Sequence, residues 1–201
     1  RGRRGRPWLS PPGSLALSLI LRPPLAYLPR LVMASSLAVL RAIETFPPLR
    51  AGIKWPNDVL IGGKKACGIL IESHLKADRV EFAIVGIGLN VNVDPAFLAN
   101  LPFPATSLSA ELGSQLSRLE VMCRLLEAME PLYLALKGGQ DPLAEWRQRL
   151  ETLGQRVRIE GEETSMEGVA EGVGPDGSLR LRLDEGTLRP VVVGDVSLRP
   201  A

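Results

Sequence analysis

Three lysines, one asparagine and one aspartate are concentrated in residues 53–73, a segment with the pattern of a β-hairpin. Two apolar runs, 59–61 and 68–71, flank the pair Gly62-Gly63. Glycine takes positive φ at no steric cost, as tight hairpin turns require. Pro56 restrains the preceding tryptophan to an extended backbone. The polar residues on or beside the hairpin are Lys54, Asn57, Asp58, Lys64 and Lys65.

These side chains could together hold an anionic substrate, because several ammonium groups and a carboxamide on one rigid element can donate hydrogen bonds to phosphate or carboxylate oxygens. The alternative is an exposed hairpin whose lysines are simply solvated, as most lysines are.

A second basic segment opens the chain. Residues 1–6 contain four arginines and two glycines, and residues 7–13 read P-W-L-S-P-P-G. Guanidinium groups and glycine amides suit phosphate oxygens. Three interpretations compete: a disordered basic tail, an RNA-binding Arg/Gly segment, or a loop that closes over a ligand.

Residues 81–93 read E-F-A-I-V-G-I-G-L-N-V-N-V, an apolar strand interrupted by Gly86 and Gly88. Glycines inside a strand indicate a bulge or the close approach of a ligand. The G-x-G lacks the third glycine and following helix of a dinucleotide-binding fingerprint, and the sequence has no P-loop motif. With His74 as the sole histidine, we expect neither a His/Cys metal site nor a serine-type triad.

The elements that must position these groups follow from hydrophobic patterning. Residues 14–21 predict a buried central strand, and residues 29–46 a helix. Residues 94–114 predict a loop. The capping box at residues 117–120 predicts a helix to about residue 136, with these residues buried: Leu119, Met122, Cys123, Leu126, Met129 and Tyr133.

A further helix is predicted over residues 141–153, with Trp146 packed inside. Short strands then follow at residues 156–160, 166–173, 179–183 and 188–193, with a turn at 174–177. This change of pattern predicts a separate small β-structure after residue 153.

Composition limits the class of protein. The chain has 201 residues, 45% of them hydrophobic, and a net charge of only +2, which argues against a dedicated nucleic-acid-binding protein. The basic start is not followed by the apolar region of a secretory signal, and no apolar run looks long enough to span a bilayer. Cys67 and Cys123 are expected to be buried thiols in a reducing compartment, with a disulfide as the alternative. We therefore expect a cytoplasmic protein.

The motifs K-W-P-N-D (54–58) and K-K-A-C-G-I-L (64–70) together resemble the central motif of biotin protein ligases. The opening R-G-R-R-G-R-P-W resembles the loop that closes over biotin and the adenylate in that family. Similar matches are V-G-I-G-L-N-V-N (85–92), A-T-S-L (105–108) and the terminal G-D-V-S-L-R (194–199).

The resemblance implies a reaction in which the biotin carboxylate attacks the α-phosphate of ATP, with Mg²⁺ carried by the polyphosphate, followed by transfer of biotin to a carrier-protein lysine. Catalytic roles are implied for Lys65, Arg3 and Asp58. Lys65 would contact both the biotin carboxylate and the α-phosphate, and Arg3 would hold the activated intermediate. Asp58 would orient or deprotonate the acceptor lysine, or else simply cap a turn. The residues implied in biotin binding are Gly2, Arg3, Arg4, Lys65 and Gly68.

The residues implied in ATP or adenylate binding are Arg1, Arg6, Trp8, Lys54, Asn57 and Asn90. No metal ligand from the protein is expected. The resemblance also implies an α+β fold, with a mixed or antiparallel sheet covered by helices in a class II synthetase-like catalytic domain (residues 1–153), plus a small SH3-like β-barrel (residues 154–201).

The family's catalytic domain begins upstream of residue 1, so this chain is expected to lack its N-terminal part, including the residues that bind the biotin ureido ring. The expected partner is a biotin carboxyl carrier protein, and a homodimer is plausible. No DNA-binding motif or membrane partner is expected. The rival interpretations are a lipoate or octanoate ligase, an inactive remnant, and an RNA-binding module.

Overall fold

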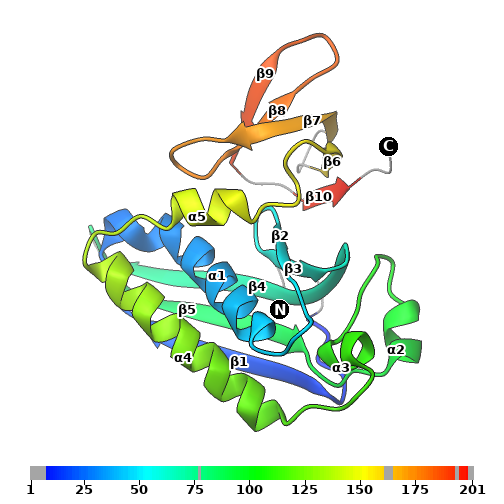
Figure 1. Cartoon of the computed structure of the whole chain (residues 1–201). Coiled ribbons are helices and arrows are strands. Elements are labelled where there is room, and N and C mark those ends of the chain that lie inside the picture. Colours follow the sequence, from blue (N-terminus) through cyan, green and yellow to red (C-terminus); the bar gives the residue numbers. More distant parts are fainter. Residues whose placement is uncertain (1–7, 77, 161–164, 193–194, 199–201) are drawn as a thin grey trace.

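The computed structural model describes residues 8–76, 78–160, 165–192 and 195–198. Two five-stranded antiparallel sheets organise these residues (Figure 1). The first has the order β1-β5-β4-β3-β2 and the second the order β10-β6-β7-β8-β9. The α+β class expected from the sequence is confirmed.

The strands of the first sheet are β1 (Ser14–Leu21), β2 (Gly52–Lys54), β3 (Asp58–Ile61), β4 (Lys64–Lys76) and β5 (Arg79–Asn90). The helices are η2 (Leu25–Arg30, 3₁₀), α1 (Leu31–Glu44), α2 (Pro95–Ala99), α3 (Leu108–Leu112), α4 (Arg118–Lys137) and α5 (Leu143–Gln148). The second sheet contains β6 (Arg156–Glu160), β7 (Ser165–Val173), β8 (Leu179–Arg182), β9 (Leu188–Val191) and β10 (Asp195–Leu198).

Helices α1 and α4 lie across one face of the first sheet (Figure 1). Helix α1 is apolar on almost every side and is buried in the core, as expected for a helix without a polar face. Its two buried hydroxyls, Ser35 and Ser36, are satisfied by hydrogen bonds of 2.7 Å to the carbonyl oxygens of Leu31 and Val32.

The stretch Leu25–Glu44, which comprises η2 and α1, is long and apolar enough to cross a membrane by length and composition alone. This corrects the expectation that no apolar run reaches such a length. In the fold, 61% of its most apolar window is buried inside the protein, where it packs against the first sheet and α4.

The prediction that residues 14–21 form a central strand is wrong. Among the described strands β1 pairs only with β5, and it stands at one edge of the sheet. Its leucines occupy every second position and pack on the core, whereas Ala16, Ser18 and Ile20 are exposed. The sequence thus contained the period-two alternation of a half-buried strand inside an apolar run.

Helix α4 begins as predicted, with the Ser117 hydroxyl accepting a hydrogen bond from the Glu120 amide at 3.3 Å. The predicted buried face is confirmed at Met129, and Tyr133 packs against the core, but the prediction is wrong at three other positions. The helix buries Val121, Leu125, Met129 and Leu136, and leaves outside Leu119, Cys123 and Leu126. Cys123 is therefore an exposed thiol, while Cys67 is buried, and the two are not joined by a disulfide.

The chain between the two sheets departs from the predicted helix over residues 141–153. Helix α5 ends at Gln148, because the backbone beyond it pairs with β2 instead. The Ile53 amide donates to the Arg149 carbonyl at 2.8 Å, and the Glu151 amide donates to the Ile53 carbonyl at 2.9 Å. Trp146 is buried as predicted. The loop predicted over residues 94–114 contains the two short helices α2 and α3.

Candidate active site

Strand register places one row of residues across the whole first sheet. Lys54 of β2 lies opposite Asp58 of β3, Asp58 opposite Gly68 of β4, Gly68 opposite Gly88 of β5, and Gly88 opposite Ala16 of β1. Cross-strand partners share a face. Because the positions in β4 and β5 carry no side chain, a ligand can approach the backbone there.

A β-bulge brings Lys65 to this face. Lys65 precedes Gly68 by three residues, so regular alternation would direct the two to opposite faces. The register between β3 and β4 shifts at residues 59 and 60, so that Leu60 lies opposite Lys65 and Val59 opposite Cys67. The extra residue restores Lys65 to the side of Asp58, which is how bulges re-aim side chains beside active sites.

The Lys65 ammonium lies 2.7 Å from an Asp58 carboxylate oxygen, with 31% and 18% of the two side chains exposed. A Cβ atom at Gly68 would lie 3.3 Å from the Lys65 Nζ and 3.6 Å from the Asp58 Oδ1. The pair is therefore partly desolvated yet accessible, and the glycine leaves room beside both charges. Three of the residues predicted for the site are thus in direct proximity.

The Trp8 ring lies over Gly88, the fourth residue of the row. A Cβ atom at Gly88 would lie 2.4 Å from the Trp8 Cζ2, a distance that real side chains do not show. Trp8 is the first described residue of the chain, and its ring lies against β5 on the face of the sheet that carries Lys65. Arg1, Gly2, Arg3, Arg4 and Arg6 lie outside the described residues.

This contact gives a matched pair of glycine substitutions. Gly88→Ala is expected to displace Trp8 and weaken biotin binding by about tenfold, which corresponds to ~1.4 kcal/mol. Gly86→Ala, two residues earlier on the same strand and face, should bind biotin like the parent, because its Cβ would lie at an ordinary 3.6 Å from the Leu70 carbonyl oxygen. Titration calorimetry and tryptophan fluorescence measure both effects. Equal biotin affinity in the two variants would contradict the expectation that biotin binding depends on the place of Trp8 over Gly88.

The segment around Pro104 and Thr106 borders Lys65 on its other side, a contact that the sequence did not predict. The Lys65 amide donates to the Pro104 carbonyl, and the Thr106 amide donates to the Lys65 carbonyl, both at 2.9 Å. The Phe103 ring lies 5.5 Å from the Lys65 ammonium, within cation–π range. A small pocket of about 410 Å³ opens beside this loop, lined by Lys64 and residues 98–99 and 101–105.

Glu111 anchors that loop to the hairpin. Its carboxylate accepts hydrogen bonds of 2.5 Å from the Lys64 ammonium and from the Thr106 hydroxyl. The bond from Lys64 is the main reason that the pKa of Glu111 falls below its usual value, with the Thr106 bond adding to it. Lys64 is therefore occupied in holding structure, whereas the neighbouring Lys65 faces the glycine row.

Both asparagines that were predicted for the site donate hydrogen bonds to backbone carbonyls. The Asn57 side chain donates to the Ile69 carbonyl at 2.5 Å, and the Ile69 amide donates to the Asn57 carbonyl at 3.0 Å. Asn90 donates to the Thr106 carbonyl at 3.0 Å. Both side chains thus fix segments next to Lys65, and their predicted nucleotide contacts stay predictions.

Within the residues that the structure describes, no group of three or more His, Cys, Asp or Glu side chains could hold a metal ion. Cys67 lies on the helix-facing side of β4, where burial raises the pKa of its thiol, so that it acts as an apolar packing group.

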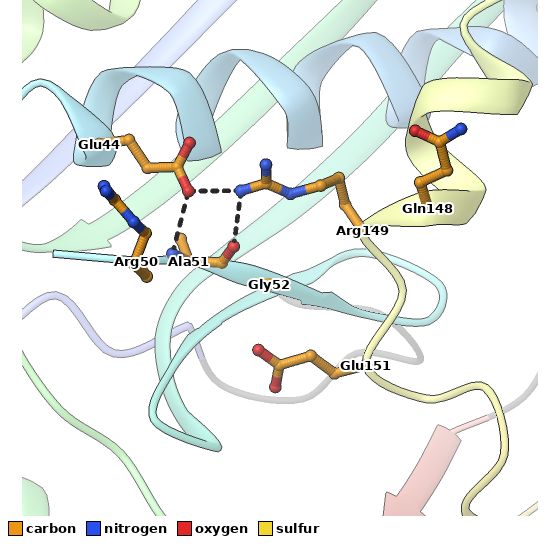
Figure 2. Close-up of a pocket in the computed structure, with 7 residues that line it drawn as sticks. All are labelled: Glu44, Arg50, Ala51, Gly52, Gln148, Arg149 and Glu151. Atoms are coloured by element: carbon orange, nitrogen blue, oxygen red, sulfur yellow. Dashed lines mark hydrogen bonds and ion pairs between the residues drawn. The ribbon is translucent and has the colours of Figure 1, made fainter.

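A larger open cavity, of about 720 Å³, shares no residue with the Lys65 cluster (Figure 2). Arg149 spans one wall, where it pairs with Glu44 and donates to the Ala51 carbonyl at 3.0 Å. Glu151 lies apart from that network, with its carboxylate against Gly52, where a Cβ atom would be 2.0 Å from the Glu151 Oε1. This partial burial raises the pKa of the Glu151 carboxyl above its ordinary value.

Glu151→Gln is expected to raise the melting temperature at pH 7, by about 1 °C because the side chain is still exposed. A folded-state pKa raised above 4.5 means that the ionised carboxylate is disfavoured in the fold, so stability is lost as pH rises through that pKa. The gain should therefore vanish below pH ~4. Glu44→Gln, which breaks the ion pair with Arg149 in the same cavity, should instead lower the melting temperature. A Glu151→Gln variant that melts below the parent at pH 7 would contradict this assignment.

Protein-family models, individual relatives and a solved structure that resemble this chain all indicate the same family of ligases. Residues 1–91 match the biotin/lipoate A/B protein ligase family, and residues 152–199 match the biotin protein ligase C-terminal domain. The biotin--[acetyl-CoA-carboxylase] ligase of Paracoccus denitrificans is 35% identical over 190 residues, which cover 90% of this chain and 79% of that protein.

The bifunctional ligase/repressor BirA of Bacillus subtilis is 37% identical over 204 residues, covering 98% of this chain. This chain spans 62% of the length of that relative. Among solved structures, the biotin protein ligase of Aquifex aeolicus in complex with biotin and ATP superposes with a TM-score of 0.80 at 30% identity, covering all of this chain and 84% of that one.

Proposed function

This chain belongs to the biotin protein ligase family, and from that premise we propose that it converts biotin and ATP to biotinyl-5′-AMP and then transfers biotin to a lysine of a carrier protein. The observation that carries the proposal is the Lys65–Asp58 pair on a row of glycines. The solved relative from Aquifex aeolicus holds biotin and ATP, which supports both as substrates.

In the first step a carboxylate oxygen of biotin bonds to the α-phosphorus of ATP, while the bond from that phosphorus to the bridging oxygen breaks and pyrophosphate leaves. Both reactants are anions, so the approach needs fixed positive charge. Lys65 supplies it where the carboxylate and the phosphate meet. Mg²⁺ bound to the polyphosphate would neutralise the leaving group, and its ligands would come mainly from the nucleotide.

In the second step the amine of the acceptor lysine attacks the carbonyl carbon of the mixed anhydride, and AMP leaves. The amine must lose a proton to become acylated. Asp58 lies 2.7 Å from the Lys65 ammonium, at the point where the intermediate would sit, and its carboxylate can orient the amine and accept that proton. Arg3 and the other residues of its loop would keep the adenylate from escaping.

The family match also supports a division into a catalytic domain, residues 1–153, and a C-terminal domain, residues 154–201. We assign an SH3-like barrel to the second, in which β9 and β10, the outer strands of the second sheet, would approach each other. The names of the relatives support a biotin carboxyl carrier domain as acceptor. A homodimer and a cytoplasmic location complete the proposal.

Exchange of labelled pyrophosphate into ATP tests the function. We expect exchange that requires biotin and Mg²⁺ and that lipoate does not support. The family model covers both biotin and lipoate enzymes, so lipoate is the decisive comparison. Exchange with lipoate alone would identify the rival lipoate ligase, and exchange with neither acid would contradict adenylation by this chain.

A further inference from the structure

A turn of the second sheet reaches the segment that carries Asp58. Residues 174–178 connect β7 to β8, and the Gly177 carbonyl accepts a hydrogen bond of 2.9 Å from the Trp55 indole. At the other side of the turn, the Pro175 carbonyl accepts from the Arg30 guanidinium, which also pairs with Asp141 at 2.9 Å. The turn is therefore fastened to the first sheet's layer at two points.

The turn is internally fixed and fits its docking place closely. The Gly174 amide donates to the Ser178 carbonyl at 2.8 Å, and the Asp176 carboxylate accepts from the Ser178 amide and hydroxyl at 3.0 and 2.6 Å. Gly177 has a φ of +83°, and a Cβ atom there would lie 2.4 Å from the Met33 Cε. A preformed turn thus meets α1 at the end of the Met33 side chain, in a backbone conformation that favours glycine.

Trp55 is held on its backbone side as well. Trp55 is 2% exposed, and its amide donates to the hydroxyl of the fully buried Thr152 at 2.8 Å. Residues 55–57 form the turn between β2 and β3. Lys54, the last residue of β2, pairs across this turn with Asp58, the first residue of β3. The anchored Trp55 therefore fixes the start of this turn, and Asp58, which pairs with Lys65, directly follows its end.

We propose that Trp55 is a positioning residue, which aligns Asp58 with Lys65 only while the turn at residues 174–178 is docked on it. This inference rests on the proposed function for its catalytic consequence. The second sheet then contributes to biotin activation without contacting the reacting atoms.

Two matched pairs of variants test it. Trp55→Phe removes the indole N–H and keeps a ring, and its control is Trp146→Phe, since the Trp146 indole is buried with no hydrogen-bond partner among the described residues. Gly177→Ala meets Met33, whereas Gly186→Ala, at a similar φ of +84°, has nothing within 4 Å. Each control carries the same chemical change without a contact to or from the turn at residues 174–178.

We expect Trp55→Phe and Gly177→Ala to lower kcat for pyrophosphate exchange by about tenfold, with KM for biotin nearly unchanged. We also expect faster amide hydrogen exchange in residues 57–69, which an effect on overall stability alone would not confine to that segment. The two controls should match the parent in both measurements.

Parent-like kcat in Trp55→Phe and Gly177→Ala, or hydrogen exchange raised equally across the chain, would overturn the inference. A parent without exchange activity would instead refute the proposed function. Hydrogen exchange at residues 57–69 would then still decide whether the turn holds this segment in place.

Discussion

Replacing Lys65 with alanine is expected to lower the rate of biotin-dependent pyrophosphate exchange by at least ~100-fold, the usual loss when a fixed donor to transition-state charge is removed. The Lys65 ammonium lies on the glycine row beside Asp58, where it is only partly screened by water. Removing it leaves the Asp58 carboxylate to repel both the biotin carboxylate and the phosphate. Initial rates of labelled pyrophosphate exchange measure the effect directly.

Lys64→Ala is the control for that variant, since it removes the same charge from the adjacent residue. Lys64 is bound to Glu111 and faces the loop rather than the glycine row. We expect it to retain most of the exchange rate while loosening residues 101–107. Equal losses in Lys64→Ala and Lys65→Ala would show that the effect is one of general charge and would contradict the site.

Gly68→Val is expected to abolish biotin binding, with an affinity loss of more than ~100-fold, or about 3 kcal/mol. Its Cβ would already lie 3.3 Å from the Lys65 Cε and Nζ, and the two methyl groups of valine would fill the space beside Lys65 and Asp58. The substitution keeps every charge of the cluster. Binding of biotin measured by titration calorimetry therefore separates loss of space from loss of charge.

A graded series sharpens this test. Gly68→Ala places one methyl group against the flexible end of a lysine, which can move by a few tenths of an ångström, so its loss should be much smaller than that of valine. Biotin affinity in Gly68→Val equal to that of the parent would show that the ligand does not occupy the face of the sheet at Gly68.

Local sequence signals predicted much of the fold. The Gly62-Gly63 turn has φ angles of +56° and +73°, as a tight hairpin requires. Four strands of the second sheet lie within a residue or two of their predicted bounds. The alternation between a core face and solvent is clear in β6 and β8. Strand β10 was not predicted as a strand, and its residues were noted only because they resemble a family motif.

The sequence did not reveal which strands and helices lie next to one another. The edge position of β1 depends on which strand lies beside it, and an apolar composition alone does not specify that. Helix α4 has apolar residues on two sides, so the face it buries was decided by its packing against α1. The charge pattern gave no sign that Cys123 would face solvent.

The sequence predicted several residues of the candidate site, but it did not predict how they are arranged in space. Lys65 shares a face with Asp58 and Gly68 because of a bulge, and no local pattern reveals a single extra residue in a ladder. Phe103 and Glu111 reach the site from a segment expected to be plain loop. The Ser107–Glu111 region did carry one usable signal, since Ser107 caps α3 by accepting from the Ala110 amide.

Transfer of biotin to its acceptor is the measurement that tests the central claim most directly. The chain is incubated with biotin, ATP, Mg²⁺ and a biotin carboxyl carrier domain. Intact-mass spectrometry then measures the mass of the carrier, and peptide fragmentation identifies the biotinylated residue. We predict one biotinyl group on one carrier lysine, formed at least ~100-fold more slowly when the chain carries Lys65→Ala. An unmodified carrier with the parent chain, or equal rates of biotinylation with the parent and Lys65→Ala, would contradict the account.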